Sequence, residues 1–233
     1  MREGKWETHY RYVLVDEFQD ISAGRMKLLQ ALNRDDTAYF LVGDDWQSIN
    51  RFAGSDVGLL RNCGDYLGHV QIRTLNKTFR FGDGILGPST EFVLSNPEQW
   101  KRTLTSASVT VDRGITVIYE DPAAGLQRAR EDIQTSAPVN GHSVLVLGRY
   151  KSSEKALQGK TPSDEFSTVH RAKGRESDYL VVLDLKDGRW GFPSKVEDDP
   201  LLELVLPPAS GGGYPFAEER RLFYVAMTRA RIG

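Results

Sequence analysis

The chain has 233 residues, with 30 lysines and arginines against 32 aspartates and glutamates, which gives a formal net charge of −2. This balance excludes a basic, histone-like protein and makes net charge uninformative about nucleic-acid binding. A hydrophobic fraction of 39% suffices for a core, and the single cysteine excludes an internal disulfide and a cysteine-rich zinc site. No apolar run approaches the roughly 18 residues of a membrane span, and the first residues do not resemble a signal peptide. We therefore expect a cytoplasmic protein with no membrane partner.

Short apolar runs recur along the chain and predict β-strands. They are rich in β-branched and aromatic residues and do not alternate with polar ones, which favours strands covered on both faces of a parallel α/β sheet. The runs are residues 12–15, 39–42, 70–75, 115–119, 143–147 and 179–185. Between the first two, Ser22 is a suitable cap for a helix carrying Met26 and Leu29, which completes a strand–helix–strand unit. The predicted fold class is α/β.

A helix is predicted over residues 216–229, after a Gly/Pro-rich loop at 207–213. Two glutamates in its first turn and arginines near its end complement the helix dipole. Arg229 follows Leu222 by seven residues, so on a helix it continues the apolar stripe. A charge on a packing face needs a partner, either a nucleotide phosphate across a domain interface or a buried carboxylate.

Two glycine-rich patterns imitate nucleotide-binding motifs. Residues 82–87 match Gly-x-Gly-x-x-Gly but do not follow a strand directly, so we expect a plain start of a helix there. Residues 159–161 read Gly-Lys-Thr, but Glu154 stands where a P-loop needs glycine. Neither pattern predicts a phosphate site.

Acidic residues follow the first predicted strand directly, in the order Asp16, Glu17, Phe18, Gln19, Asp20. Ligands of parallel α/β sheets bind at the carboxyl ends of the strands. Two adjacent acids there suit a division of labour in which one holds Mg²⁺ and the other deprotonates an attacking water. A solvated turn at the end of a strand is the alternative.

Polar and aromatic residues also follow the later strands. Gln47 comes after the second strand and could share a cleft with Glu17 if the two strands are neighbours. Phe52, beside Arg51, is either a stacking platform for nucleic-acid bases or a core residue. Arg80 comes directly after Phe79 and pairs a fixed charge with a flat ring.

Five segments, in this order, resemble motifs of the UvrD/Rep group of superfamily-one DNA helicases. Each alone is moderately specific, and their common order makes the resemblance strong. The segments are residues 15–20, 42–49, 78–80, 168–174 and 218–230. Asp-Asp-Trp-Gln at 44–47, Phe-Arg-Phe at 79–81 and Gly-Phe-Pro at 191–193 are most similar to the helicase IV branch of this family.

The resemblance implies a nucleotide, ATP with Mg²⁺, held between two RecA-like domains. Asp16 would coordinate Mg²⁺, and Glu17 would be the general base. Gln47 and Arg80 would contact the γ-phosphate, and Arg229 would act as the arginine finger.

The resemblance also implies contacts to the rest of the nucleotide and to DNA. Phe79 would stack on adenine, and Glu176 would hold the ribose. Phe52 takes the place of a tryptophan that stacks on single-stranded DNA, while Asn50 and His170 lie at positions facing the DNA. Phe52 and Asn50 stand where relatives have a larger aromatic residue and a tyrosine, so stacking here is expected to be weaker or differently placed.

One departure concerns the P-loop, which lies upstream of the Asp-Glu strand in the family. Only residues 1–11 precede that strand here, and none of them forms a P-loop. We therefore expect the C-terminal part of a helicase core, with a remnant of the first RecA-like domain at 1–68 and most of the second at 69–233. The missing N-terminal half of the core would be a required partner, and the chain alone would not hydrolyse ATP.

The main hypothesis is an ATP-driven 3′-to-5′ DNA helicase or translocase that acts on single-stranded or partly duplex DNA, with the polarity taken from the resemblance alone. The rival is a non-catalytic module, derived from a helicase, that binds nucleic acid or RNA polymerase. An unrelated Mg²⁺ hydrolase using Asp16 and Glu17 ranks third, because it leaves Gln47 and Arg229 unexplained.

Overall fold

The computed structural model describes residues 9–108, 114–136, 141–155, 157, 165–196 and 214–233. This part of the chain is mixed α/β, and the strands of all its sheets pair in parallel, as the sequence predicted. The described residues divide into two compact units, a first that ends at residue 73 and a second that begins at residue 74 and includes 214–233. The predicted limits of two RecA-like domains stay a prediction, because compactness alone does not identify a domain type. The loop at 207–213 and the Gly-Lys-Thr pattern at 159–161 lie outside the described residues.

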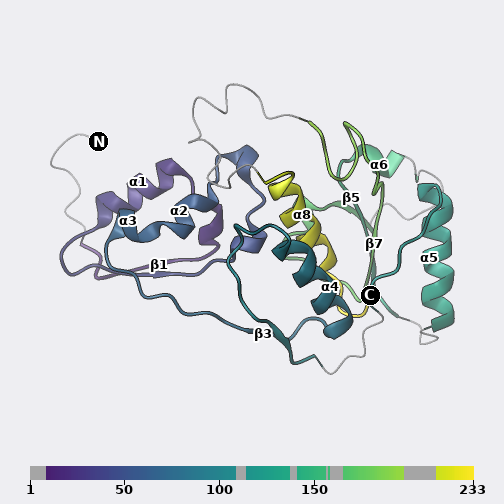
Figure 1. Ribbon diagram of the computed structural model, residues 1–233, viewed down its shortest axis with the longest axis horizontal. Coiled ribbons are helices and arrows are strands. Elements are labelled where there is room, and N and C mark those ends of the chain that lie inside the picture. Colours follow the sequence, from purple (N-terminus) through teal and green to yellow (C-terminus); the bar gives the residue numbers. More distant parts are fainter. Residues whose placement is uncertain (1–8, 109–113, 137–140, 156, 158–164, 197–213) are drawn as a thin grey trace. The chain divides into compact units, whose positions relative to one another are not determined.

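The first unit is built on two neighbouring parallel strands, β1 (Tyr12–Val15) and β2 (Ala38–Leu41). They are joined by α1 (Ala23–Leu32), whose first turn is capped by the predicted residue: Ser22 Oγ accepts the Arg25 N–H at 3.4 Å. Two short helices, α2 (Val57–Arg61) and α3 (Cys63–Leu67), lie on the same side of the strands as α1 (Figure 1). The strand–helix–strand unit predicted from the sequence is therefore confirmed.

Only one face of this strand pair is covered in the described unit. Tyr12, Leu14 and Phe40 are exposed, whereas the side chains that alternate with them are half-buried beneath the helices. The prediction of strands covered on both faces is wrong here, because an uninterrupted apolar run does not specify what lies over each face.

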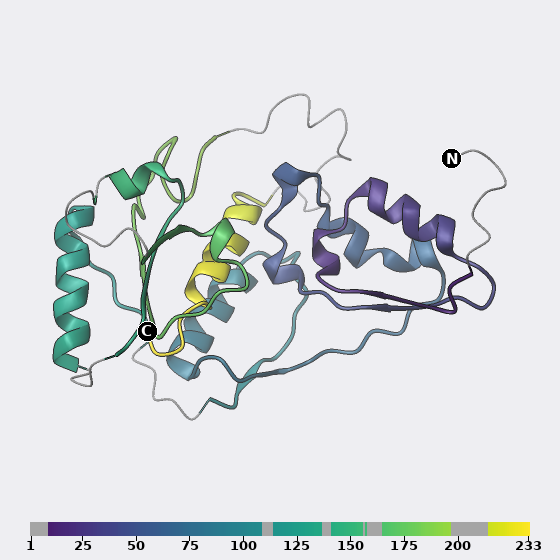
Figure 2. The same ribbon diagram turned by 180° about the vertical axis from the view of Figure 1, so that it is seen from behind.

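The second unit contains a three-stranded parallel sheet of β6 (Phe166–Thr168), β5 (Val144–Gly148) and β7 (Tyr179–Val182), in that order. The sheet lies between α5 (Pro122–Ser136) on one side and α4 (Asp83–Leu94) with α8 (Ala217–Met227) on the other (Figure 2). Leu126 of α5 and Val146 of β5 belong to one hydrophobic cluster together with Leu157 and Leu183.

The remaining elements are short. Strands β3 (Lys77–Thr78) and β4 (Thr105–Ser106) pair with each other, and α6 (Ser152–Lys155) follows β5. Single 3-10 turns occur at Phe18–Asp20, Asp45–Gln47, Arg51–Ala53 and His170–Ala172.

Three predicted elements differ from the structure. Residues 70–75 and 115–119 form no strand, and their apolar side chains include several that are exposed, with Tyr119 92% exposed. The C-terminal helix ends at Met227, so Arg229 lies beyond the helix and does not continue its stripe. The glycine pattern at 82–87 is the start of a helix, as expected, since α4 begins at Asp83. Within the described ranges, no helix is both long and apolar enough to cross a membrane.

Candidate active site

The two strands of the first unit bring their following residues to one edge. Because β1 and β2 are parallel neighbours, Asp16 and Glu17 emerge beside the turn that carries Gln47. Gln47 Nε2 donates to Asp44 Oδ2 at 2.6 Å, and Asp44 Oδ1 accepts the Trp46 N–H at 3.0 Å. Glu17 and Gln47 could share a site only if the two strands were neighbours, and the structure shows that they are.

A buried glutamine connects these two strand ends. Gln19 is 1% exposed, and its carboxamide Nε2 donates to the carboxylate of Glu17 while its Oε1 accepts the Asp44 N–H at 2.9 Å. Since Asp44 holds Gln47, a continuous chain of hydrogen bonds runs from Glu17 through Gln19 and Asp44 to Gln47. We call this chain the Gln19 bridge. Sequence reasoning gave Gln19 no role, because nothing in the motif indicates that this residue is buried.

Gly43 explains why the Gln19 bridge fits. A Cβ at this position would lie 3.0 Å from Gln19 Oε1 and 3.1 Å from the Gln19 backbone nitrogen. Such contacts are tighter than those that side chains normally make, so any larger residue would displace the carboxamide. A glycine two residues after the end of β2 was the one sequence signal of this close approach.

Glu17 is held in an unusual backbone conformation. Its φ of 50° and ψ of 40° are left-handed, a region that costs a non-glycine residue about 1–2 kcal/mol. Its N–H donates to Asp16 Oδ1 at 2.8 Å, and the following turn is tied to β2 by the Phe18 N–H, which donates to the Val42 carbonyl at 2.8 Å. Glu17 is therefore strained, and contacts that follow both β1 and β2 hold it in place.

The donor set at the end of β1 suits Mg²⁺. The described residues contain no cluster of three or more His, Cys, Asp or Glu side chains arranged to hold a metal. Mg²⁺ at phosphate-transfer sites is nonetheless bound by one or two carboxylates together with phosphate oxygens and water. Asp16 and Glu17 supply hard carboxylate oxygens of this kind, and the Asp16 carboxylate already lies against the backbone of Glu17.

The predicted DNA-facing residues of the first unit lie just after this site. Asn50 Nδ2 donates to Asp20 Oδ2 at 2.9 Å, which connects the end of motif 15–20 to the turn at Arg51–Ala53. Phe52 in that turn is 60% exposed, so its interpretation as a core residue is wrong. Its ring is accessible for stacking.

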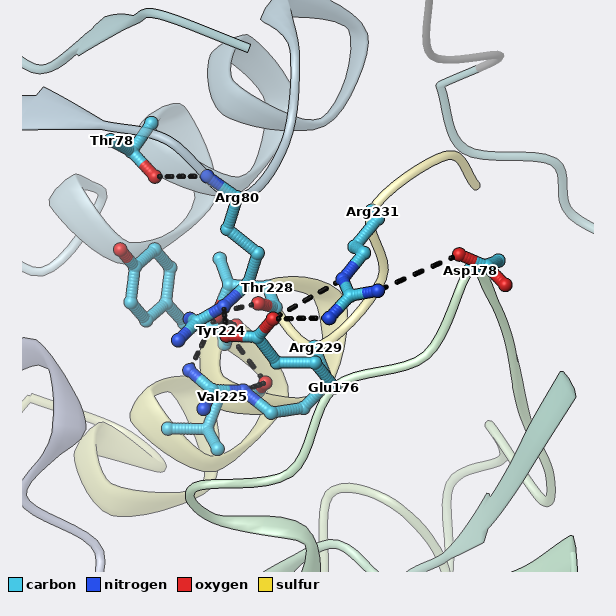
Figure 3. A network of polar contacts seen from close by, with 9 residues as sticks. All are labelled: Thr78, Arg80, Glu176, Asp178, Tyr224, Val225, Thr228, Arg229 and Arg231. Carbon is cyan, nitrogen blue, oxygen red and sulfur yellow. Dashed lines mark hydrogen bonds and ion pairs between the residues drawn. The ribbon is translucent and has the colours of Figure 1, made fainter. Parts of the chain in front are cut away.

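In the second unit, three predicted site residues converge around the end of α8 (Figure 3). Arg80 Nε donates to Glu176 Oε1 at 2.6 Å, and Arg80 Nη1 donates to the Thr228 carbonyl at 3.3 Å. Arg229 comes directly after Thr228, so Arg80, Glu176 and Arg229 belong to one network.

A second arginine shares the carboxylate of Glu176. Arg231 donates from Nε and Nη2 to Glu176 Oε2 at 3.2 and 3.1 Å, and its Nη1 lies 3.9 Å from Asp178 Oδ1 (Figure 3). The hydrogen bond and charge of Arg80, with a smaller contribution from Arg231, lower the pKa of Glu176 despite partial burial. Sequence reasoning missed Arg231, and the sequence carries no local signal that it pairs with a residue 55 positions away.

Arg229 is buried, as the sequence led us to expect, but for a different local reason. It is 2% exposed, and its Nε donates to the Val225 carbonyl at 3.1 Å while Nη2 donates to Thr228 Oγ1 at 3.4 Å. The guanidinium therefore folds back on carbonyl and hydroxyl groups at the end of α8. A cation close to the C-terminal end of a helix interacts favourably with the helix dipole.

Two further predicted residues of this unit are Phe79 and His170. Phe79 is exposed, with Lys77 Nζ 5.8 Å from the centre of its ring. His170 lies in the turn His170–Ala172 directly after β6 and is half-buried.

Two family profiles match this chain. The profile of the UvrD/REP helicase N-terminal domain matches residues 3–66, and that of the UvrD-like helicase C-terminal domain matches residues 147–232. The chain belongs to the UvrD/Rep helicase family. Asp16, Glu17 and Gln47 lie inside the first match of this helicase family and Arg229 inside the second, whereas Arg80 lies between the two.

Individual relatives in the UvrD/Rep family are also similar over long stretches. DNA helicase IV of Escherichia coli is 34% identical over 99% of this chain, which corresponds to 34% of that protein. A probable DNA helicase of Mycoplasma pneumoniae is 25% identical over 94% of the chain and 42% of its own length. The ATP-dependent DNA helicase Rep of Salmonella typhimurium is 28% identical over 44% of the chain and 15% of its own length. The chain thus spans about a third of helicase IV and less than half of the other two.

Proposed function

We propose that this chain is the part of an ATP-driven DNA helicase or translocase that supplies the catalytic base on one side and the arginine residues on the other. The observation that carries the proposal is the Gln19 bridge. It ties a carboxylate suited to activate water to an amide suited to sense a phosphate, at the carboxyl ends of two parallel strands.

In this mechanism Glu17 accepts the proton of the water that attacks the γ-phosphate. Gln19 fixes the direction of the Glu17 carboxylate, and Gln47 donates a hydrogen bond to a γ-phosphate oxygen. Asp16 would hold Mg²⁺, and the bound ion would supply positive charge to offset the charge that develops on the phosphates. The bridge makes the positions of base and sensor interdependent.

Residues of the second unit act on the same nucleotide in this proposal. Arg80 leaves Glu176 to meet the γ-phosphate, and Arg231 stays on Glu176, so that this carboxylate keeps a counter-charge. Arg229 stabilises the transition state as the arginine finger, a role worth about 10³–10⁵-fold in kcat in related phosphoryl-transfer enzymes. In this proposal Glu176 also holds the ribose, and the exposed ring of Phe79 stacks on adenine.

In this proposal the protein moves along single-stranded DNA. Phe52 stacks on the bases of a single strand, and Asn50 and His170 contact the same strand, so that alternating grip moves it with 3′-to-5′ polarity. The 233 residues contain no Gly-x-x-x-x-Gly-Lys-Thr/Ser pattern. We therefore infer that other residues cradle the phosphates and that the chain alone hydrolyses ATP negligibly.

The test is the Glu17→Gln variant of the intact protein, with Glu91→Gln, an exposed glutamate of α4, as the control. Loss of a general base lowers turnover by about 10²–10⁴-fold. DNA-stimulated ATP hydrolysis should fall by this factor in Glu17→Gln alone, while ATP affinity, measured with a fluorescent analogue, stays within about twofold of wild type. Equal loss of binding and hydrolysis would contradict the assignment of Glu17 as the base.

A further inference from the structure

Three loops follow the carboxyl ends of the strands in the three-stranded sheet and lie at one edge of it. Strands β6, β5 and β7 are parallel neighbours, so the residues that follow each of them emerge on the same side. His170 follows β6, Tyr150 follows β5, and the segment 183–196 follows β7. His170 is the proposed DNA contact of this unit, and the other two loops emerge at the same edge.

Two of these loops build an aromatic surface. Trp190 is 62% exposed, and its ring meets the ring of Tyr150 edge to face, with the centres 5.4 Å apart. The guanidinium carbon of Arg189 lies 5.6 Å from the centre of the Trp190 ring. We call Tyr150, Arg189 and Trp190 the Trp190 platform.

A network of less exposed polar contacts holds the platform in place. Arg149 lies 4.8 Å from the centre of the Tyr150 ring and donates from Nε and Nη2 to Glu219 Oε1 at 2.9 and 2.7 Å. Glu219 Oε2 accepts the Ser194 N–H at 2.9 Å, and Ser194 Oγ lies 2.6 Å from the Tyr150 hydroxyl. These polar contacts thus join the first turn of α8 to the loop after β7, next to the platform.

The loop that carries Trp190 is also tightly folded. A Cβ at Gly191 would collide with the Lys186 carbonyl oxygen, so the chain passes where only glycine fits. The Phe192 N–H donates to the same carbonyl at 3.2 Å. The ring of Trp190 is therefore presented by a fixed backbone, which reduces the entropy lost when a flat ligand stacks on it.

The charges of the platform favour an anionic ligand. Glu219 is paired with Arg149, and Asp187 is paired with Lys195 at 2.7 Å, so the negative charges of these two acids are compensated. Arg189, by contrast, forms no ion pair with any residue in the described part of the chain. A stacked ring beside an exposed guanidinium combines the two features by which proteins hold single strands, base stacking and phosphate attraction.

We propose that the Trp190 platform stacks on a base of single-stranded DNA while Arg189 meets a neighbouring phosphate, extending the strand's path beyond His170. The proposal rests on the DNA-binding part of the proposed function. Single exposed aromatic residues are common on protein surfaces. What distinguishes this one is its supported loop, its second ring and its adjacent arginine, all at the ligand-binding edge of a parallel sheet.

The test uses the whole 233-residue chain and a fluorescein-labelled oligothymidylate of about 16 nucleotides, a length near the upper end of single-strand site sizes. Binding is followed by anisotropy for wild type, Trp190→Ala, Trp190→Phe and Arg189→Gln. Tyr119→Ala is the matched control, because Tyr119 is an exposed aromatic residue elsewhere in the same unit. Thermal unfolding of each variant verifies that these surface changes leave the fold intact.

Trp190→Ala should raise Kd about 5- to 100-fold, the range that base stacking corresponds to, and Trp190→Phe should recover most of the affinity. Arg189→Gln should reduce the salt dependence of log K by roughly 0.7, the value for one phosphate on a single strand. Wild type and Trp190→Ala should bind an abasic oligomer equally, because it keeps the phosphates and lacks the bases.

A wild-type chain that binds the oligonucleotide with an affinity unchanged by Trp190→Ala would overturn the platform and leave the proposed helicase function standing. The same unchanged affinity is expected if the Trp190 ring binds a protein instead of DNA, so that case too overturns the platform. A wild-type chain that does not bind single-stranded DNA at all would overturn both the platform and the DNA-binding role of this chain.

Discussion

Replacing Gln19 by methionine removes the Gln19 bridge while keeping the volume of a buried side chain. The change deletes one hydrogen bond to the Glu17 carboxylate and one from the Asp44 N–H at 2.9 Å. Hydrogen bonds to charged groups contribute about 1.5–3 kcal/mol. If the bond to Glu17 is needed in the transition state, this range corresponds to a roughly 10- to 100-fold loss of kcat at about 1.4 kcal/mol per factor of ten. Stability of the first unit should fall by about 1–3 kcal/mol, because water can reach Glu17 and offset part of the loss.

The assay is DNA-stimulated ATP hydrolysis of the intact protein, with ATP affinity and thermal unfolding measured on the same preparations. Gln99→Met is the matched control, since Gln99 is a similarly buried glutamine of the second unit that accepts a hydrogen bond from Arg221 at 3.3 Å. It should lower stability by a similar amount without lowering kcat. The reasoning is refuted if Gln19→Met keeps full turnover, or if its kcat falls only as far as that of Gln99→Met.

Three further predictions follow from the same contacts. Gly43→Ala should lower kcat at nearly unchanged ATP affinity, since the added Cβ presses on Gln19 Oε1; turnover equal to wild type would show that the carboxamide can move freely. Phe52→Ala should weaken single-strand binding by about 1–3 kcal/mol per stacked base and reduce DNA-stimulated hydrolysis far more than basal hydrolysis, and an equal loss of both would argue against stacking. The lowered pKa of Glu176 means that its contribution to stability is present above about pH 4.3, its ordinary range, and is lost as pH falls through the lowered pKa. The midpoint of thermal unfolding of Glu176→Gln should therefore lie below that of wild type at neutral pH and converge with it in acid, whereas parallel curves would exclude the linkage.

The strands that the sequence predicted correctly are those that find a parallel partner. Residues 12–15 pair along their length, and so do residues 144–147 of the predicted run 143–147. The equally apolar run at 115–119 forms no strand, because strand formation depends on a partner that no local pattern encodes. Periodicity also left open which face of β1 is covered, since a continuous apolar run looks the same whether one face or both are buried.

The sequence indicated which residues could form the candidate site, but not how their side chains are connected. The acids after β1 and the amide after β2 were recognisable because parallel strands end at a common edge. The burial of Gln19, which joins them, and the pairing of Arg80 with Glu176, 96 positions away, depend on tertiary packing. Arg229 illustrates the same limit: its burial was expected from helical spacing, yet the helix ends two residues earlier and the side chain turns back onto carbonyl groups.

The central claim is that side chains of both units act on one γ-phosphate, and binding of ADP with aluminium fluoride tests it most directly. This complex imitates the phosphoryl group in transit, so the intact wild-type protein should bind it more tightly than ADP alone. Gln47→Ala in the first unit and Arg80→Ala in the second should each abolish that preference. Arg231→Ala, which removes the other partner of Glu176, should retain it. A preference that survives Arg80→Ala and is lost in Gln47→Ala would show that the first unit acts alone, and it would contradict the account.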